Sequence, residues 1–526
     1  MPEPAPDRGD PDVSAPASVG RGALAGLLGA GAALVTIEFV SLADATGTSV
    51  TLAIQNWFIK HVAGGLKQWA IDRFGHNDKI ALQLGTALVV LALGALVGAI
   101  ARDRWKVVAG VFAAFAVLGI VVALDDPLVS AAVAVIAAVA GVVAGVAVAV
   151  GLERRWRVPL GPGRGTASDL PVLSRRGVLL GGGAIAAGLF VGDLVARGVR
   201  ASMRQAKTAV TRALPRPSKV TEIPATQPFE VQGLTPYIVP AADFYRIDTA
   251  LEVPTVDAAS WTLKVTGMVD HELTFTYDDL LARRDLVELP VTLQCVSNEV
   301  GGDLVGNARW TGVPLTTLLR EAGVHRGADQ VMGESVDGFT AGFPLDVALD
   351  GRHALLAIGM NGRSLPAVHG YPARLVVPGL YGYVSATKWI KEIRLTTFDA
   401  EVGYWIPLGW SRLGPVKTAS RIDVPHSGDS IAAGRVSVAG VAWAPSRGIR
   451  KVEVAVDDGP WKAAELGRVA SSDTWVQWRW PWDASRGDHT IAVRATDGDG
   501  KVQTAHLAPP EPNGSTGHHT IEVSVR

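Results

Sequence analysis

Long apolar runs in the N-terminal part of this 526-residue chain constrain its fold more than any other feature. Residues 107–151 carry only two charged side chains, Asp125 and Asp126. Pro127 follows these charges and divides the run into two stretches of roughly 20 residues, the length of a helix that crosses a bilayer. Three further stretches have the same character: 22–43, 81–101 and 177–196. The sequence therefore predicts a helical anchor of about five transmembrane spans over residues 21–198.

Two N-terminal segments do not fit the pattern of a span. Residues 1–20 are rich in Pro, Ala, Gly, Ser and Asp without apolar periodicity, which is typical of a disordered cytoplasmic tail. Residues 50–74 interleave Trp57, Trp69 and two lysines with apolar residues. This pattern favours an amphipathic helix on the membrane surface over a sixth span, which would invert the topology.

Five spans place the two ends of the chain on opposite sides of the membrane. The distribution of Lys and Arg does not decide the orientation, because both choices place basic residues inside. Ser174-Arg175-Arg176 directly precedes the last apolar run, and the segment 174–179 resembles a twin-arginine export signal. The alternative is a pair of ordinary stop-transfer arginines. An export signal starts in the cytoplasm, so we expect a multi-pass protein of the cell membrane whose large C-terminal region lies on the extracytoplasmic side.

Charge and cysteine content exclude several classes of function. The chain has 49 Lys and Arg against 50 Asp and Glu, so no global field attracts nucleic acid. Cys295 is the single cysteine, which excludes an intrachain disulfide, a four-cysteine iron–sulfur cluster and a cysteine-rich zinc site. The anchor contains only His61 and His76, which do not form a facing pair in two spans, so we expect no bis-histidine haem there.

Beyond the anchor, composition divides the chain into three parts. Residues 199–233 form a basic, proline-bearing linker. Residues 234–424 mix short apolar runs with helix-like runs and predict an α+β domain. Residues 425–526 contain alternating runs separated by Gly, Asp and Pro, which predicts an immunoglobulin-like β-sandwich. Four tryptophans of its run TWVQWRWPW are expected in the core or at a subunit contact: Trp475, Trp478, Trp480 and Trp482.

Cys295 is the first candidate for chemistry. It ends the apolar run LPVTLQC, where a polar, glycine-rich segment begins, and strand ends that face loops commonly carry site residues. Its thiolate is a soft ligand that could hold one position of a metal whose other ligands come from a cofactor. The alternative is a small buried side chain in a core.

Two long motifs around this cysteine resemble a known family. The strings TLQCVSNEVGGDLVGNARWTGVPLTTLL (292–319) and LPAVHGYPARLVVPGLYGYVSATKWIKEIRL (365–395) are similar to the molybdenum-cofactor domain of the sulfite oxidase family of molybdopterin-dependent oxidoreductases. The resemblance covers about residues 234–526, including an immunoglobulin-like dimerisation domain. The anchor makes the chain look like a membrane-anchored bacterial variant of that family.

The resemblance implies a set of site residues. Cys295 would be both a catalytic residue and the protein ligand of a molybdenum that one molybdopterin otherwise holds. Arg246 would be a second catalytic residue near the metal, with Asp248 where the family usually has His. The resemblance further implies five cofactor-binding residues, of which Ser385 and Lys388 would lie near the phosphate: Asn298, His369, Arg374, Ser385 and Lys388.

One departure from the family pattern affects the expected substrate. Glu299 and Val300 stand where sulfite oxidases carry paired arginines, so a dianion should bind less well. We therefore expect two-electron oxygen-atom transfer on a small molecule, with oxidation of a sulfite-like oxyanion as the nearest specific reaction. Reduction of a sulfoxide or N-oxide, and a non-catalytic envelope scaffold, are the alternatives. An enzyme of this kind needs a separate redox partner such as a quinone or a cytochrome, and the resemblance of the sandwich to the family's dimerisation domain implies a homodimer.

Overall fold

The computed structural model describes residues 19–44, 48–61, 73, 78–101, 104–156, 195, 198–199, 213–223 and 229–526. The chain divides into two compact units, Met1–Lys207 and Thr208–Arg526. The predicted export motif at 174–179 and most of the predicted last span at 177–196 lie outside the described residues. Each unit is described below by itself.

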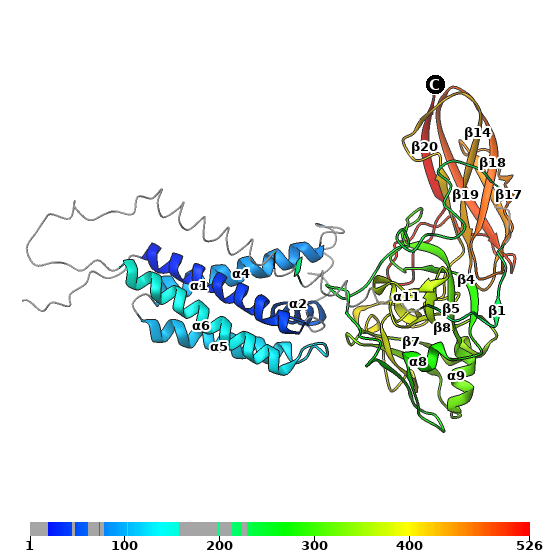
Figure 1. The fold of residues 1–526 in the computed structure, drawn as a ribbon. Coiled ribbons are helices and arrows are strands. Elements are labelled where there is room, and N and C mark those ends of the chain that lie inside the picture. The colour runs from blue at the N-terminus through cyan, green and yellow to red at the C-terminus, as the bar shows by residue number, and fades with distance from the viewer. Residues whose placement is uncertain are drawn as a thin grey trace, which may run out of the picture. The chain divides into compact units, whose positions relative to one another are not determined.

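The first unit is a bundle of helices (Figure 1). Four of its helices are long and apolar enough to cross a membrane, in agreement with four of the predicted spans. Its elements are α1 (Val19–Val40), the short η1 (Ser41–Ala43), α2 (Val50–His61), α4 (Asp78–Ile100), α5 (Trp105–Ala123) and α6 (Ala131–Trp156).

Helix α1 packs on α4 and α6 through glycines. A Cβ atom added at Gly26 would lie 2.0 Å from the carbonyl oxygen of Gly94 and 2.9 Å from the Cα of Gly98. A Cβ added at Gly29 would lie 2.7 Å from the carbonyl oxygen of Gly145. Small residues of this kind let membrane helices approach until their backbones touch. We call these contacts of Gly26 and Gly29 the glycine seam of α1, and a larger side chain at either position would force a helix to move.

Helix α2 is the described part of the segment predicted to lie on the membrane surface. Its buried residues include Val50 and Ala53, which pack with Ala123 and Ala134. Ser49, which precedes the helix, donates a 2.9 Å hydrogen bond to the buried Glu38 of α1. This contact supplies the polar partner that a carboxyl group needs inside an apolar bundle.

The second unit begins with two sheets that form the expected α+β domain. The first sheet has the strand order β1-β4-β5-β8-β10, with β9 paired to β8, and the second has the order β3-β2-β11-β6-β7. The strands of the first sheet are β1 (Lys219–Val220), β4 (Val287–Gln294), β5 (Val305–Pro314), β8 (Leu355–Met360), β9 (Arg363–Ser364) and β10 (Arg374–Val376). Those of the second are β2 (Thr262–Gly267), β3 (Leu273–Thr276), β6 (Gln330–Ser335), β7 (Thr340–Pro344) and β11 (Ile390–Thr396).

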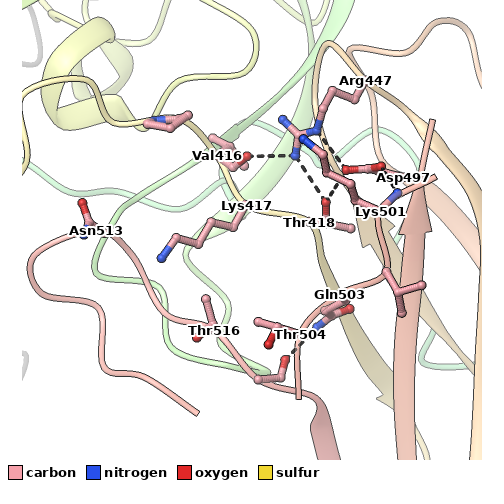
Figure 2. Close-up of a pocket in the computed structure, with 13 residues that line it drawn as sticks. Val416, Lys417, Thr418, Arg447, Asp497, Lys501, Gln503, Thr504, Asn513 and Thr516 are labelled. Atoms are coloured by element: carbon pink, nitrogen blue, oxygen red, sulfur yellow. Dashed lines mark hydrogen bonds and ion pairs between the residues drawn. The ribbon is translucent and has the colours of Figure 1, made fainter. Parts of the chain in front are cut away.

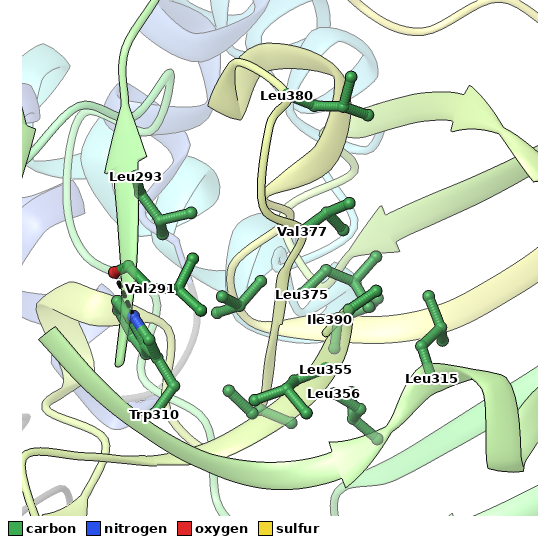
Figure 3. Close-up of a cluster of buried hydrophobic side chains, with 14 of the residues drawn as sticks. Val291, Leu293, Trp310, Leu315, Leu355, Leu356, Leu375, Val377, Leu380 and Ile390 are labelled. Carbon is green, nitrogen blue, oxygen red and sulfur yellow. Dashed lines mark hydrogen bonds between the residues drawn. The ribbon is translucent and has the colours of Figure 1, made fainter. Parts of the chain in front are cut away.

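Short helices connect these strands, and a single hydrophobic core fills the domain. The helices are α8 (Tyr277–Leu281), α9 (Leu315–Ala322), α10 (Leu345–Leu349), α11 (Gly382–Ser385), η3 (Ala367–His369) and η4 (Ile406–Leu408). Figure 3 shows part of the core, where Trp310 of β5 donates a 3.2 Å hydrogen bond to the carbonyl of Val291 in β4. Every residue of β4 after Val287 is buried, so the strand that leads to Cys295 is fixed on both faces.

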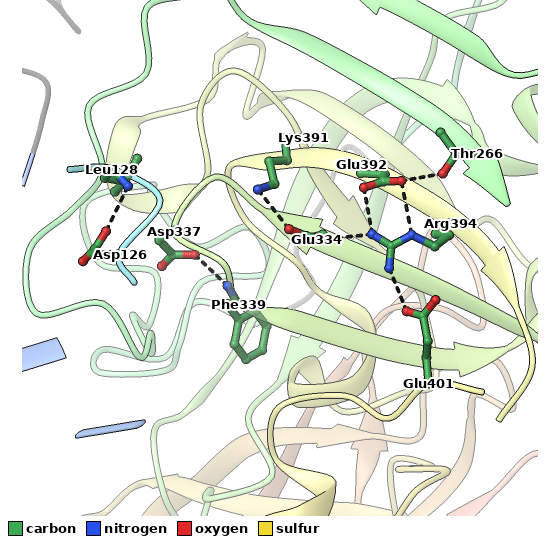
Figure 4. Close-up of polar contacts among 10 residues, drawn as sticks. All are labelled: Asp126, Leu128, Thr266, Glu334, Asp337, Phe339, Lys391, Glu392, Arg394 and Glu401. Carbon is green, nitrogen blue, oxygen red and sulfur yellow. Dashed lines mark hydrogen bonds and ion pairs between the residues drawn. The ribbon is translucent and has the colours of Figure 1, made fainter. Parts of the chain in front are cut away.

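A network of charges borders the second sheet (Figure 4). The guanidinium of Arg394 in β11 lies 2.8 Å from carboxylate oxygens of Glu334, Glu392 and Glu401. These groups are half-buried, and Thr266 of β2 also donates to Glu392. The network joins three elements of the domain edge and lies apart from the predicted site residues.

Part of the segment 199–233, which the sequence assigns to a linker, belongs to the first sheet. Lys219 and Val220 pair in parallel with β4, and Ser218 donates a 2.8 Å backbone hydrogen bond to Leu286. A two-residue edge strand that follows Pro215 and Pro217 gives little strand signal, because proline cannot donate to a ladder.

The predicted C-terminal β-sandwich is confirmed. One sheet has the order β12-β14-β18-β17 and the other β13-β20-β19-β15-β16. Its strands are β12 (Ala419–Val424), β13 (Ser430–Ile431), β14 (Gly434–Trp443), β15 (Ile449–Val456), β16 (Lys462–Ala463), β17 (Glu465–Leu466), β18 (Val476–Ala484), β19 (Gly487–Asp497) and β20 (His519–Val525). The four tryptophans of TWVQWRWPW are buried, as predicted.

The sandwich starts earlier than the sequence indicates. Strand β12 pairs with β14, with Ala419 opposite Trp443, although the sequence divides the chain at residue 425. The run ASRIDV looks like the end of the preceding domain because Pro425 follows it directly. Val441, Trp443 and Trp475 belong to the core of the α+β domain, so the two domains share a hydrophobic interior.

Candidate functional site

Cys295 lies directly after β4, as the sequence predicts for a site residue. Its backbone N–H donates a 2.9 Å hydrogen bond to Leu304, and the residue is 8% exposed. Burial raises the pKa of the thiol, whereas hydrogen bonds from Ser297 and the charge of Lys388 act in the opposite direction. The free thiol is therefore protonated at neutral pH, and a metal that binds here must displace the proton.

Asn298 closes the loop that follows Cys295. Its backbone N–H donates to the carbonyl of Cys295 over 3.1 Å, and its side-chain oxygen accepts a 2.8 Å hydrogen bond from the backbone of Leu304. The side chain is buried against its own loop. Asn298 therefore shapes the turn that holds the cysteine.

Arg374 and His369 both belong to the second motif and lie next to each other. The Arg374 guanidinium donates to the carbonyls of His369 (3.2 Å) and Leu375 (3.3 Å) and lies 5.1 Å above the centre of the Trp310 ring. Arg374 is 5% exposed, and burial lowers its pKa to about 10. Among the described residues, no carboxylate lies within ion-pair distance of this guanidinium.

His369 is a neutral donor in this arrangement. Its Nε2–H donates a 2.7 Å hydrogen bond to the carbonyl of Ala241, and Phe244 lies edge-on to the ring. Burial, followed by the charges of Arg374 and Lys388, lowers the pKa of His369 to about 4. The imidazole therefore adds no positive charge at neutral pH.

Lys388 and Arg246 share one carboxylate. The side chain of Asp248 is 3% exposed, and its Oδ2 lies 3.1 Å from the Lys388 ammonium and 2.9 Å from Nε of Arg246. Burial lowers the pKa of Lys388 to about 8, and Asp248 acts against this shift. The Arg246 side chain is 42% exposed, so its charge faces solvent at the edge of the cluster.

Glycine 370 allows the backbones that carry these cations to approach. It has a φ of 109° and caps η3 before the chain enters β10. A Cβ atom at Gly370 would lie 3.0 Å from the Cβ of Arg374 and 3.1 Å from that of Lys388. Any other residue would be strained and would push the two cations apart.

Ser385 lies outside the cluster of cations. It is fully buried in α11 and donates a 3.0 Å hydrogen bond to the carbonyl of Tyr381. Its hydroxyl is thereby used to hold the turn of α11. The structure thus brings together Cys295, Arg246, His369, Arg374 and Lys388, while Ser385 and Asn298 support the backbone around them.

Sequence reasoning missed two tyrosines at the site. Tyr245 is partly buried, and burial, together with the nearby Cys295, raises the pKa of its hydroxyl, whereas the charge of Arg374 acts in the opposite direction. Burial also raises the pKa of Tyr381 to about 12, with Cys295 again contributing. Tyr245 directly precedes Arg246 in DFYRIDTA, and this adjacency to a predicted site residue could have identified Tyr245 from the sequence.

Three buried or partly buried cations meet one buried carboxylate at this site, which leaves an excess of positive charge. Buried charges without partners are costly, and a bound anion would relieve that cost. In the described part of the chain, no group of three or more His, Cys, Asp or Glu side chains could hold a metal ion. A single thiolate beside surplus cations fits an anionic, phosphate-bearing cofactor that brings its own metal ligands.

A separate open pocket is lined by residues 415–418, which precede β12, and by residues of the C-terminal sandwich (Figure 2). It has a volume of about 500 Å³, and its lining includes Lys417, Arg447 and Asp497. Asp497 already accepts hydrogen bonds from Thr418 (2.8 Å) and Arg447 (3.1 Å). None of the predicted site residues lines this pocket.

Comparisons with known proteins find a family model and several relatives that match part of the chain. Residues 250–405 match the family model of the oxidoreductase molybdopterin-binding domain. Mitochondrial sulfite oxidase of Homo sapiens is 28% identical over 323 residues, which cover 52% of this chain and 58% of the human protein. Nitrate reductase [NADH] 2 of Nicotiana tabacum is 32% identical over 178 residues, which cover 29% of this chain and 20% of that protein.

One solved structure extends the comparison. The sulfane dehydrogenase SoxCD from Paracoccus pantotrophus is 22% identical, with a TM-score of 0.46, and the match covers 57% of this chain and 87% of the SoxCD chain. The chain spans a little over half the length of the human sulfite oxidase that it matches.

Proposed function

Because residues 250–405 form a molybdopterin-binding oxidoreductase domain of the sulfite oxidase type, we propose that this protein is a membrane-anchored molybdenum enzyme. It catalyses two-electron oxygen-atom transfer on a small substrate on the extracytoplasmic side of the membrane. Oxidation of a sulfite-like oxyanion is the nearest specific reaction. Electrons pass to a separate redox partner, a quinone or a cytochrome, and the sandwich forms a homodimer.

The excess of buried positive charge beside Cys295 carries this proposal. Arg374 is 5% exposed and the Lys388 side chain is 11% exposed, yet among the described residues only Asp248 forms an ion pair with Lys388, and no carboxylate forms one with Arg374. An anion with several oxygens would accept hydrogen bonds from both cations. The pterin phosphate is such an anion, and it would fix the cofactor in one orientation.

The residues at the site have separate roles. Cys295 would supply a thiolate to the metal, with Ser297 donating hydrogen bonds to the sulfur. When bound, the molybdenum–molybdopterin group supplies a two-electron redox centre for oxygen exchange. Arg246 remains partly exposed and would attract an anionic substrate to the edge of the cluster. Tyr245 keeps its proton and can donate a hydrogen bond to a bound group.

The charge at the mouth of the site favours a weakly charged substrate. Glu299 is exposed, and Asp248 neutralises part of the charge of Arg246 and Lys388. Among the described residues of the cluster, Arg246 is then the partly exposed arginine that could hold a substrate oxyanion. We therefore assign a small, singly charged or polar substrate.

Metal analysis of the purified full chain tests the enzyme proposal. We expect about one molybdenum per chain, its loss in Cys295→Ser, and its retention in Ser524→Ala, whose exposed hydroxyl lies in β20. A folded wild-type chain that never carries molybdenum would instead identify an envelope scaffold. A substrate screen with a redox dye then separates oxidation of oxyanions from reduction of sulfoxides and N-oxides.

The membrane topology needs its own test. Four described helices are long and apolar enough to span, and the proposed export motif with the fifth span would place the second unit outside. Replacing Arg175 and Arg176 by Lys should leave the second unit inside, protected from added protease in intact cells. Continued protease sensitivity in the variant would contradict the twin-arginine assignment.

A further inference from the structure

The loop that follows Cys295 is held from the C-terminal sandwich. The hydroxyl of Ser515 donates a 2.6 Å hydrogen bond to the carbonyl of Asn298. Nη1 of Arg421 donates a 2.9 Å hydrogen bond to the carbonyl of Gly302. On the other side of the cysteine, the indole of Trp443 donates a 2.7 Å hydrogen bond to the side chain of Gln294. Residues from the sandwich therefore contact the chain both before and after Cys295.

Arg421 is itself rigidly placed. Its Nε lies 2.7 Å from a carboxylate oxygen of Asp423, Nη2 donates to Thr235 over 2.9 Å, and the side chain is 11% exposed. Three fixed partners leave a planar guanidinium with one geometry. The carbonyl of Gly302 is thus fixed relative to the sandwich.

A close packing contact supports the same loop. Gly301 has a φ of 79°, and a Cβ atom added there would lie 2.3 Å from the ring of His519 in β20. His519 is oriented by a 3.0 Å hydrogen bond that its Nδ1 accepts from the backbone of Ile422. The loop can adopt this position only with glycine at residue 301.

The loop, which the structure describes throughout, contains no helix or strand. Between Cys295 and Val305 it forms turns, and the side chains of Ser297, Glu299 and Asp303 are exposed. Its position therefore depends on a few backbone contacts, of which Ser515 and Arg421 supply two. Since the N–H of Asn298 binds the carbonyl of Cys295, displacement of Asn298 would also displace the cysteine.

We propose that Ser515 and Arg421 are positioning residues that fix the Cys295 thiolate toward the cofactor. This assignment rests on the proposed function. It gives the sandwich a role inside each chain, in addition to any contact between chains. The residues act through the loop and do not touch the cofactor.

Hydrogen exchange of the full chain prepared without cofactor tests the contact independently of the metal. In Ser515→Ala and Arg421→Gln, the backbone amides of 295–304 should exchange about five- to tenfold faster, as expected for loss of one hydrogen bond. Ser515→Thr keeps the hydroxyl and should restore slow exchange. Two matched controls, Ser524→Ala and Arg479→Gln, remove exposed contacts elsewhere in the sandwich and should leave the loop unchanged.

The loaded full chain supplies the second measurement. Because Arg374 and Lys388 would still hold the cofactor, we expect Ser515→Ala to retain molybdenum and to shift the absorption band of the thiolate–metal bond. Unchanged exchange in both Ser515→Ala and Arg421→Gln, or an unchanged band in the loaded variants, would overturn the positioning role. A wild-type chain without molybdenum would refute the proposed function instead, while the exchange result would still report on the loop contact.

Discussion

Replacing Lys388 by Met should change how the stability of the cofactor-free protein depends on pH. Met has a similar length and no charge, so it removes an ammonium that lies 11% exposed next to a single carboxylate. Burial lowers the pKa of this lysine from 10.5 to about 8. The unfolded chain keeps the ordinary value, so the two states bind different numbers of protons between pH 8 and pH 10.5.

The sign and size of the effect follow from this difference. Below pH 8 the lysine is charged in both states, and the full cost of burying the charge, about 3 kcal/mol, is present. As the pH rises through 8, the folded protein releases the proton while the unfolded chain retains it, so stability increases. From pH 7 to pH 9.5 the wild type should gain about 2 kcal/mol relative to Lys388→Met.

Thermal unfolding of the cofactor-free full chain in detergent, followed by near-ultraviolet circular dichroism, measures this gain. A change of about 2 kcal/mol corresponds to roughly 4 °C in a unit of this size. Lys264→Met, at an exposed position of β2, is the matched control and should show no such change. Equal differences between wild type and Lys388→Met at both pH values would refute the argument that the ammonium is desolvated. With cofactor bound, the phosphate should keep the lysine charged and remove the pH dependence.

Three further predictions follow from the described contacts. Burial keeps His369 neutral in the folded protein down to a pKa of about 4, whereas the unfolded chain binds the proton below pH 6.5. The free energy of unfolding of the wild type should therefore fall by about 3 kcal/mol between neutral pH and pH 4. In acid unfolding, that of His369→Gln should fall by about 3 kcal/mol less. Arg374→Gln should lower molybdenum content at least about tenfold in metal analysis, because it removes a buried cation from the cofactor site. Gly26→Leu should make the anchor aggregate in size-exclusion chromatography, whereas Gly85→Leu, which has open space around it, should not.

The sequence predicted the parts of this molecule that local patterns encode. The four long apolar helices follow from the length of the apolar runs, and the position of Cys295 at the end of a strand follows from a strand-like run that ends where a glycine-rich loop begins. The cations of the second motif, Arg374 and Lys388, lie together because the backbones that carry them both approach Gly370, which has no side chain. These features depend on residues close together in sequence.

Features that depend on distant residues were not predictable in this way. Ser515 contacts Asn298 across 217 residues, and Asp248 contacts Lys388 across 140. The carboxylate of Asp248 was noted only as a departure from a family pattern, although it joins two cations. Strand β1 was read as linker because only pairing with β4, which is far along the chain, makes it a strand.

The glycine seam of α1 has a consequence for biosynthesis. Helix α1 is translated before α4 and α6, which carry the glycines that it packs against: Gly94, Gly98 and Gly145. If the helices enter the bilayer in order, the glycine-bearing face of α1 must contact lipid tails until α4 and then α6 emerge from the ribosome. Assembly of the anchor is then a late event, and the interval before it is the period in which insertion factors and membrane proteases can act on the incomplete chain.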